Sequence, residues 1–377
     1  MNAEDIFFAY DAASARRALR DRYYDLMLLD VLLPARDGAS PAGDVSADFL
    51  REIVEDETSP SPGRVVAITS ELGAIDAFDS EFRNLVTQIL HVDPGVDTWK
   101  YSLGSLVSHV RSVASARMQF DYDVCIQATL RAPELSAVLA LPGISWLPEE
   151  PLSRGLLFRR GEMEVGGRKL KLACAHATQM GLVPAAHLAS QMINCLRPRV
   201  LIMTGICGSV NDSTLVGDII VADKSWDWQA GKWTADGSLC IAPDQKEASS
   251  ELVALARGVD EVSREWYERY ENAKPAARPT VRVAPVASGS AVVADSNFQE
   301  LFKRQHRKVD GIDMECYGFY HSAIMADEPN PLVLCIKAVS DKADSTKSDD
   351  FQGYCSHMSA MAAQHVFRRY FESRWRE

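Results

Sequence analysis

The segment "LVLCIKAVSDKADS", residues 332–345, decides the fold of the larger part of the chain. Its apolar run predicts one buried strand, which ends abruptly at Ser340 and Asp341. A carboxylate at that point would be largely shut away from water, where an unpaired charge is costly. The pattern leaves two interpretations of Asp341: a residue with a chemical role, or an Asp that caps the turn after the strand.

The chain of 377 residues is longer than one average domain, so two domains are expected. No apolar run is long enough to span a bilayer, and the first residues lack the layout of a secretion signal. The eight cysteines are scattered without a C-x-x-C pair, which is typical of reduced thiols rather than of disulfides or a zinc site. A net charge of -12 argues against a nucleic-acid surface. We therefore predict a cytoplasmic protein that binds neither membrane nor nucleic acid.

Strand-like and helix-like segments alternate along the whole chain, which favours α/β domains. We expect the first domain over residues 1–117 and the second over residues 118–377, because a fresh strand opens shortly after Met118. One helix is expected over residues 249–271 and another in "MECYGFYHSAIMA". The strands expected in the first domain include "DIFFAY", "YDLMLLDVLLP" and "RVVAITS". Those expected in the second are "DVCIQATL", "LKLACAHA", "RVLIMTGI", "GDIIVADKSW", "VRVAPVASG" and "PLVLCIKAVSD".

Asp30 and Thr69 end two of the strands expected in the first domain, where open α/β sheets bind their ligands. With the D-x-x-x-P spacing after Asp30, this domain resembles the receiver domains of response regulators, which have a flavodoxin-like fold. The resemblance implies that Asp30 accepts a phosphoryl group from a histidine kinase, with Mg²⁺ nearby, and that the Thr69 hydroxyl turns toward it. The alternative is a strand-end Asp that caps a turn.

Two parts of the receiver pattern are missing. The first strand with its acidic pair is absent, and Glu4 and Asp5 lie at the start of the wrong strand. Asp93 stands where the family has a Lys, with Lys100 as a nearby substitute. Either the chain is truncated, or this domain no longer takes phosphate and serves in docking or oligomerisation.

Four motifs follow one another in the second domain: "ATLRAPELSAV", "LIMTGICGSV" with "GDIIVAD", "ASGSAVVAD" with "GIDMECYGF", and "IKAVSDKAD". In this order they resemble the nucleoside phosphorylase superfamily, in particular its nucleosidases for methylthioadenosine, S-adenosylhomocysteine and AMP. The resemblance extends from Tyr122 to the C-terminus. It implies an α/β phosphorylase-type domain with a central mixed sheet.

Cleavage of the N-glycosidic bond of a purine nucleoside needs an acid for the leaving base and a nucleophile on the opposite face of the sugar. Apolar surroundings help a carboxyl group to keep its proton. The resemblance implies that Asp341 protonates the purine, oriented by the Ser340 hydroxyl, and that Glu134 activates a water molecule. Glu134 has an alternative interpretation, as a first-turn residue favoured by the helix dipole.

The resemblance also implies the residues that bind the substrate. Met314 would lie under the sugar, and Glu315 would accept hydrogen bonds from both ribose hydroxyls, since a carboxylate has two oxygens. Without that role, Met314 is a core residue and Glu315 a solvated helix residue. The base would lie against a glycine-bearing turn in "TGICGSV" and against two valines: Ile206, Cys207, Gly208, Val292 and Val293.

Arg131 lies three residues before Glu134 and would bind either free phosphate or the 5′-phosphates of a nucleotide. Arg159, Arg160, Lys224 and Lys232 are further candidates for such phosphates. The stretch "AHATQMGLVPAA" carries no Arg, which favours hydrolysis over phosphorolysis. We expect no cofactor for this reaction, and we expect a homo-oligomer whose interface involves apolar helices of the second domain.

The preferred hypothesis is a purine N-ribosidase that acts on an adenine-containing nucleoside or nucleotide, with ATP among the candidates, and that is gated by the first domain. The fusion resembles a bacterial antiphage defence architecture, in which a two-component relay switches on an effector that splits ATP. Two alternatives remain open: a phosphate-dependent phosphorylase, and a non-catalytic module that binds a nucleotide and passes on a signal.

Overall fold

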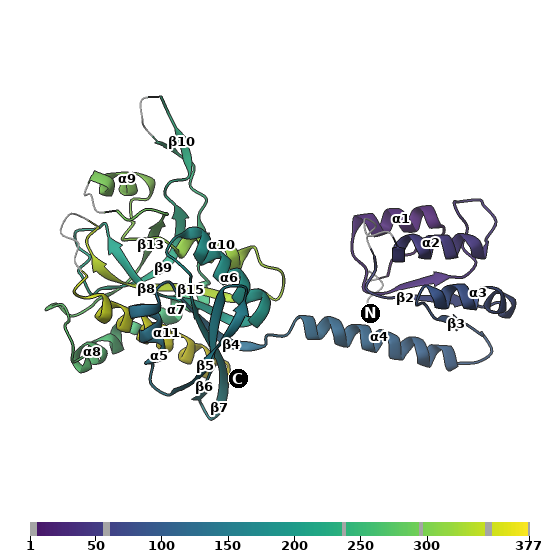
Figure 1. Ribbon diagram of the computed structural model, residues 1–377, viewed down its shortest axis with the longest axis horizontal. Coiled ribbons are helices and arrows are strands. Elements are labelled where there is room, and N and C mark those ends of the chain that lie inside the picture. Colours follow the sequence, from purple (N-terminus) through teal and green to yellow (C-terminus); the bar gives the residue numbers. More distant parts are fainter. Residues whose placement is uncertain (1–5, 56–60, 236–238, 294–296, 344–348, 376–377) are drawn as a thin grey trace. The chain divides into compact units, whose positions relative to one another are not determined.

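The chain folds into two compact units, residues 1–118 and 119–377, in a computed structural model (Figure 1). The structure describes residues 6–55, 61–235, 239–293, 297–343 and 349–375. Among these residues, no helix combines the length and the apolar character that crossing a membrane requires. The division falls one residue after the boundary expected from the sequence.

The first unit is a parallel sheet with strand order β1-β2-β3. Its apolar core lies between the sheet and the helices α1, α2 and α3, and includes Leu29, Phe49, Leu50, Ala67 and Phe82. The elements are β1 (Met27–Asp30), β2 (Val65–Thr69), β3 (Ile89–His91), α1 (Ala12–Asp21), α2 (Gly43–Glu55), α3 (Leu72–Asn84) and α4 (Thr98–Arg117).

The strand predicted at "DIFFAY" is wrong for the described residues of this segment, residues 6–10, which form no strand. The Phe7 ring instead packs against Tyr24, with 6.2 Å between the ring centroids. The Arg22 guanidinium lies over both of these rings. Aromatic and cation–π contacts thus hold the segment where a strand would have needed a backbone partner. Asp5 lies outside the described residues.

The second unit is built on a mixed sheet of ten strands in its described part, in the order β12-β9-β13-β14-β8-β4-β7-β6-β5 with β15 paired to both β8 and β9. The strands are β4 (Tyr122–Ala128), β5 (Ile144–Ser153), β6 (Leu156–Val165), β7 (Arg168–His176), β8 (Pro198–Ser209), β9 (Ile219–Asp227), β12 (Lys246–Glu247), β13 (Val281–Ser288), β14 (Gly311–Asp313) and β15 (Leu332–Asp341). A separate hairpin joins β10 (Gly231–Trp233) to β11 (Leu239–Ile241).

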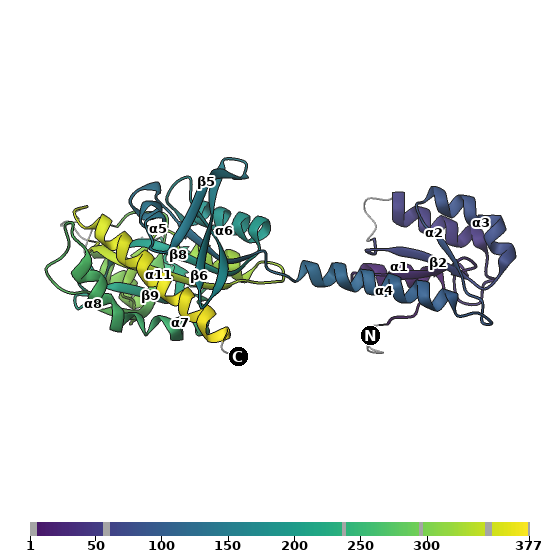
Figure 2. The same ribbon diagram turned by 90° about the horizontal axis from the view of Figure 1, so that it is seen from below.

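Helices cover both faces of this sheet. The helices are α5 (Ser136–Leu139), α6 (Leu182–Leu196), α7 (Ser250–Ala256), α8 (Val259–Arg269), α9 (Asn297–Gln305), α10 (Cys316–Ile324) and α11 (Gln352–Arg374). One apolar core includes side chains of α7 and α11, and Figure 2 shows α11 lying across the sheet. The other core includes side chains of α6 and α10.

Strand β15 is buried on both faces, because its side chains alternate between the two cores. Leu334, Ile336 and Ala338 belong to the core under α11. Val333, Cys335 and Val339 belong to the core under α6 and α10. This is the reason for the continuous apolar run in the sequence. Lys337 places a charge within the run, and it is 1% exposed.

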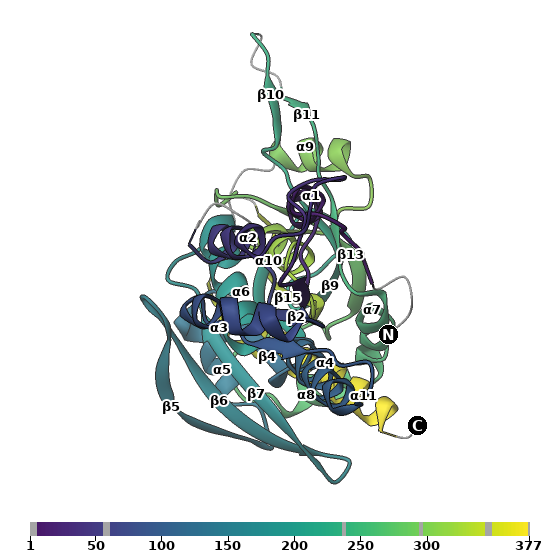
Figure 3. The same ribbon diagram turned by 90° about the vertical axis from the view of Figure 1, so that its right-hand side faces the viewer.

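Strands β5 and β6, which were not predicted from the sequence, lie beside β7 at one edge of the sheet (Figure 3). Strand β5 contains Pro148 and Pro151, which argue against a central strand. It tolerates them because it is an edge strand, and its pairing with β6 shifts register at two places. Helix α3 of the first unit was not predicted either.

Three predicted segments have different boundaries in the structure. The single helix expected over residues 249–271 is two helices, α7 and α8, which are interrupted near Gly258. The predicted turn "TGICGSV" is part of strand β8, which runs on to Ser209. The helix expected at "MECYGFYHSAIMA" begins only at Cys316, after the short strand β14.

Candidate active site

A cavity of about 140 Å³ opens where strands β4, β8, β14 and β15 end. Parallel strands of an open sheet bring their carboxyl ends to one edge, so residues distant in sequence meet there. The predicted site residues that line this cavity are Glu134, Ile206, Gly208, Val292, Val293, Met314, Glu315, Ser340 and Asp341. Thr129, Leu130, Met180, Ala291, Ile312, Asp313, Ala343 and Gln352 complete its described lining.

Asp341 is the last residue of β15 and is 8% exposed. The Ser340 hydroxyl donates to its Oδ2 over 3.0 Å, and the backbone N–H of Ala343 donates to its Oδ1 over 2.9 Å. These donors fix the direction in which the carboxyl group points. The group lies at the end of a strand buried on both faces, as its position in the sequence suggested.

Glu134 is held entirely by backbone groups in the described structure. It lies in a short π-helical turn, Arg131–Leu135, between β4 and α5, and is 2% exposed. The N–H groups of Thr129 and Leu130 donate to Oε2 over 2.7 and 2.8 Å, and that of Ile206 donates to Oε1 over 3.0 Å. Three such donors compensate a buried carboxylate and leave little freedom of orientation.

Gly205 permits this close approach of Glu134 to strand β8. A Cβ atom at this position would lie 2.3 Å from Glu134 Oε1, and its φ of +151° strains any other residue. The glycine in "TGICGSV" therefore makes room for a carboxylate from another segment. It does not form a turn.

Glu315 is held by a side chain, the buried ammonium group of Lys337. Lys337 Nζ lies 2.9 Å from Glu315 Oε2 and 3.3 Å from Asp313 Oδ2. The backbone N–H of Gly181 reaches Glu315 Oε1 over 3.3 Å. Glu315 is 4% exposed, so it is not the solvated helix residue that the sequence left as an alternative.

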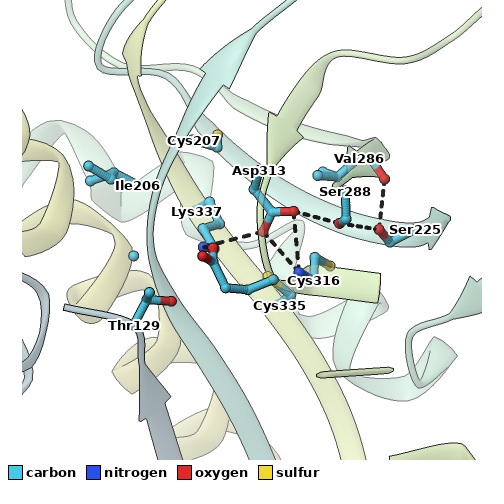
Figure 4. A network of polar contacts seen from close by, with 12 residues as sticks. Thr129, Ile206, Cys207, Ser225, Val286, Ser288, Asp313, Cys316, Cys335 and Lys337 are labelled. Atoms are coloured by element: carbon cyan, nitrogen blue, oxygen red, sulfur yellow. Dashed lines mark hydrogen bonds and ion pairs between the residues drawn. The ribbon is translucent and has the colours of Figure 1, made fainter. Parts of the chain in front are cut away.

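Asp313 connects Lys337 to two serines of neighbouring strands (Figure 4). Ser288 Oγ donates to Asp313 Oδ1 over 2.5 Å, and Ser288 and Ser225 share a hydrogen bond of 2.8 Å. The N–H of Cys316 also donates to the Asp313 carboxylate, which anchors the first residue of α10. The two residues between this anchor and β14, Met314 and Glu315, are thereby held at the cavity.

Lys337, Asp313, Glu315 and Glu134 form a buried cluster in which the acidic groups outnumber the basic one. Burial raises the pKa of the Glu315 carboxyl; the Lys337 ammonium lowers it in part, and Asp313 and Glu134 add to the rise. Burial by itself would lower the pKa of Lys337, but the carboxylates of Glu315, Asp313 and Glu134 hold it well above its usual value. One cation therefore stays charged among three carboxyl groups.

Lys337 and Asp313 were not predicted as site residues. Both signals were present in the sequence: a lone charged residue inside the apolar run of β15, and an acidic residue directly before Met314 and Glu315. Charged residues are almost never fully buried unless they are paired. A Lys at the centre of a buried strand therefore predicts buried carboxylates around it.

Two predicted binding residues do not line the cavity. Arg131 is exposed, and its guanidinium lies 3.4 Å from Glu149 instead. Cys207 is buried, and its backbone carbonyl accepts a hydrogen bond of 3.4 Å from the Ser340 hydroxyl. Neither Arg nor Lys occurs in the described lining, which also leaves out Arg159, Arg160, Lys224 and Lys232.

The predicted phosphoacceptor pair lies at adjacent strand ends of the first unit. Asp30 is exposed at the end of β1, and its Oδ1 accepts from the N–H of Leu32 over 2.9 Å. Thr69 ends β2, is buried, and accepts from the N–H of Glu71 over 3.1 Å. Lys100, the expected substitute for the missing Lys, pairs with Asp97 over 2.7 Å. Glu4 lies outside the described residues.

Residues 125–372 match the family model of the Phosphorylase superfamily. The chain belongs to this superfamily. The match covers most of the second unit, in agreement with the resemblance of its four motifs. It does not include the first unit, so the receiver resemblance and the role of Asp30 stay predictions.

Three relatives of this superfamily member differ in how much of the chain they share. The uncharacterized protein y4jS of Sinorhizobium fredii is 30% identical over 97% of this chain and 92% of its own length. The ATP nucleosidase Cap17 of Escherichia coli is 23% identical over 52% of this chain, which spans only 40% of Cap17. A 5′-methylthioadenosine/S-adenosylhomocysteine nucleosidase of Desulfotalea psychrophila is 27% identical over 45% of this chain and 67% of its own.

Solved structures show the same fold at lower identity. A mutant of the Helicobacter pylori 5′-methylthioadenosine nucleosidase, with 5′-methylthioadenosine in its active site, has a TM-score of 0.53 and 19% identity, covering 66% of this chain and 99% of that one. The futalosine hydrolase of the same organism has a TM-score of 0.54 and 19% identity over 66% of this chain and 98% of its own. These likenesses confirm the α/β phosphorylase-type fold expected for the second unit.

Proposed function

We propose that the second unit hydrolyses the N-glycosidic bond of an adenine-containing nucleoside and releases the free base. The observation that carries the proposal is the meeting of Asp341, Glu134 and Glu315, from three separate segments, around one cavity. The relatives named as nucleosidases support the same reaction class. Each carboxyl group has a distinct set of partners, which suits three distinct roles.

In the proposed reaction, Asp341 gives its proton to N7 of the purine as the bond between C1′ of the ribose and N9 breaks. The bonding electrons leave with the base, which departs neutral. Glu134 accepts a proton from the water molecule whose oxygen attacks C1′ from the opposite face, so the products are the free sugar with its 5′-substituent and the free base. The hydrogen bond from Ser340 holds the donor in place.

Glu315 is suited to hold the sugar. Each carboxylate oxygen has two lone pairs, and the described contacts use one on each oxygen, for Gly181 N–H and for Lys337. The remaining lone pairs can accept two ribose hydroxyls. The excess negative charge of Glu315, Asp313 and Glu134 over Lys337 would also stabilise the positive charge that develops on the sugar ring.

The described lining of the cavity favours an uncharged substrate over ATP. It contains four acidic residues, Glu134, Asp313, Glu315 and Asp341, and neither Lys nor Arg. Leu130, Met180 and Met314 add apolar surface there. Among the residues that the structure describes, a triphosphate would meet like charges and no cation at this site. We therefore propose adenosine or a 5′-thioether nucleoside as the preferred substrate.

The test is incubation of the full chain with adenosine, methylthioadenosine, AMP and ATP in buffer without phosphate, followed by chromatography of the products. We expect adenine from the two uncharged nucleosides at higher rates than from AMP or ATP. Adenine release that requires added phosphate would make the protein a phosphorylase. Binding without turnover would leave the non-catalytic signalling module, and faster turnover of ATP would overturn the substrate preference.

We further propose that the first unit regulates this reaction, which would suit a defence effector; the strand-end positions of Asp30 and Thr69 support the idea. The test is incubation with acetyl phosphate and Mg²⁺, followed by intact-mass measurement and the nucleosidase assay. We expect a gain of one phosphoryl group that Asp30→Ala abolishes. Absence of the gain would leave docking or oligomerisation as the role of this unit.

A further inference from the structure

The ammonium group of Lys342, the residue directly after the proposed proton donor, is bound to the loop that joins β8 to β9. This β8–β9 loop comprises residues 210–218. Lys342 Nζ donates to the backbone carbonyls of Asn211 over 3.2 Å, of Asp212 over 3.4 Å, and of Thr214. The Lys342 side chain is half-buried, so these carbonyls replace part of the water that would otherwise surround the charge. The contact ties the end of β15 to one turn of this loop.

The β8–β9 loop is fixed by further contacts that do not involve Lys342. The N–H of Gly217 donates to the carbonyl of Val339 over 2.8 Å, and the N–H of Val339 donates to the carbonyl of Asp218 over 2.9 Å. The Arg282 guanidinium donates to the carbonyl of Ser213 over 2.6 Å and pairs with the buried Asp218 carboxylate over 3.3 Å. The loop is therefore a firm support for a side chain that binds to it.

The turn from Asp341 to Ala343 needs such a support because its backbone is strained. The φ angle of Ala343 is +51°, in the left-handed region that residues other than Gly rarely adopt. This conformation directs the Ala343 N–H to Asp341 Oδ1 over 2.9 Å. A strained conformation persists only where its surroundings determine it. The turn has two such anchors: the Ala343 methyl group, buried in one apolar cluster with Val210 and Ile312, and the Lys342 ammonium group.

We propose that Lys342 is a positioning residue for Asp341, an assignment that rests on the proposed function. Lys342 does not belong to the described lining of the cavity, so it acts through Asp341 and not on the substrate. By tying the turn to the β8–β9 loop, it keeps the Ala343 N–H on Asp341 Oδ1 and fixes the direction in which the carboxyl group points. A proton donor must lie within hydrogen-bond reach of the atom that it protonates, so a small displacement slows the reaction.

Steady-state kinetics of the full chain, on the best substrate of the unmodified protein, test this assignment. Lys342→Met removes the ammonium group and keeps the length of the side chain. Lys342→Arg keeps a cation that can donate to the same carbonyls. The control is Lys274→Met, because the Lys274 ammonium group also binds backbone carbonyls, those of Tyr267 over 2.6 Å and Tyr270 over 2.7 Å. Lys274 lies outside the described lining of the cavity.

We expect Lys342→Met to lower kcat by about 10–10²-fold and to change KM by less than about threefold, because the lost contact affects proton transfer and not substrate binding. Lys342→Arg should keep more of the original kcat than Lys342→Met does. Lys274→Met should leave kcat and KM unchanged, although it loses the same kind of structural contact. A Lys342→Met variant with the kcat of the unmodified chain would overturn the proposal. Equal losses of kcat in Lys342→Met and Lys274→Met would also overturn it.

Hydrogen exchange followed by mass spectrometry tests the same contact without an activity assay. The Ala343 N–H is bound to Asp341 Oδ1, so peptides that contain Ala343 report whether the turn is held. We expect exchange there to be about tenfold faster in Lys342→Met and unchanged in Lys274→Met. Unchanged exchange in Lys342→Met would overturn the positioning role. Absence of adenine release by the unmodified chain would instead refute the proposed function, and the exchange result would still decide whether Lys342 holds the turn.

Discussion

Two carboxylates that line the cavity, Glu134 and Glu315, are both buried, but they are held by different kinds of partner. Around Glu134, the donors are the backbone N–H groups of Thr129, Leu130 and Ile206. Around Glu315, the principal donor is one side chain, Lys337. A carboxylate held by backbone groups keeps its donors when a neighbouring side chain is shortened. One held by a single ammonium group depends on that residue, so the two regions should respond differently to mutation.

The largest effect on stability is expected from Lys337→Met. This change leaves Glu315 and Asp313 buried without their cation, which costs about 3–5 kcal/mol of unfolding free energy. Urea denaturation measures the loss. The control is Lys169→Met, which removes an exposed pair with Glu162 and should leave the free energy of unfolding nearly unchanged. Equal losses in the two variants would contradict the importance of the buried cluster.

A smaller loss is expected from Glu134→Gln. The amide NH₂ group cannot accept a hydrogen bond, so at least one backbone N–H loses its partner, at about 1–3 kcal/mol. Nucleosidase activity should fall as well, because Gln cannot take a proton from water. The control is Glu149→Gln, which affects only the loose pair with Arg131. If Glu134→Gln unfolded at the same urea concentration as the unmodified chain, the three backbone hydrogen bonds to Glu134 would not contribute to stability.

The smallest effect is a change in pH dependence for Glu315→Gln. Burial raises the pKa of Glu315 above its usual 4.5, so the folded state binds this proton more tightly than the unfolded chain. This tighter proton binding stabilises the folded state fully below pH 4.5. The stabilisation is lost as the pH rises through the pKa that Glu315 has in the folded protein, by at most about 1.4 kcal/mol per pH unit. The variant should lack this decline.

Glu162→Gln provides a control of opposite sign for the pH experiment. The hydrogen bond from Lys169 lowers the pKa of Glu162, so its contribution is present above pH 4.5 and is lost as pH falls. The Glu162 side chain is exposed, so solvent screens the effect. Urea denaturation at several pH values gives the slope of the unfolding free energy against pH for each variant. A Glu315→Gln slope equal to that of the unmodified protein would show that Glu315 does not titrate abnormally.

The sequence predicted the side chains of the site better than their surroundings. Asp341, Glu134 and Glu315 stand in recognisable motifs, and the structure brings all three to one cavity. The donors around Glu134 are backbone groups, which every residue possesses, so no residue type marks them in a sequence. Strand β5 was not predicted because its two prolines argue against a central strand. They do not exclude an edge strand, which is the position that β5 has in the sheet.

The sequence could not predict which acidic partners the basic residues contact. Arg131 is close to Glu134 in sequence, but its side chain leaves the cavity for Glu149, because the tight turn between them points the two residues apart. Lys337 lies 22 residues from Glu315 in sequence, and only the packing of β14 against β8 and β13 brings Glu315 to it. Such contacts depend on sheet order, which residue patterns do not specify.

The central claim is that Asp341 donates the proton that lets the purine leave. Adenine release by Asp341→Asn, measured without phosphate on the best substrate of the unmodified chain, tests it most directly. We expect a fall of about 10²–10⁴ in kcat with an unaltered melting temperature, because Asn has no proton to give. An Asn variant that releases adenine at the original rate would contradict the claim.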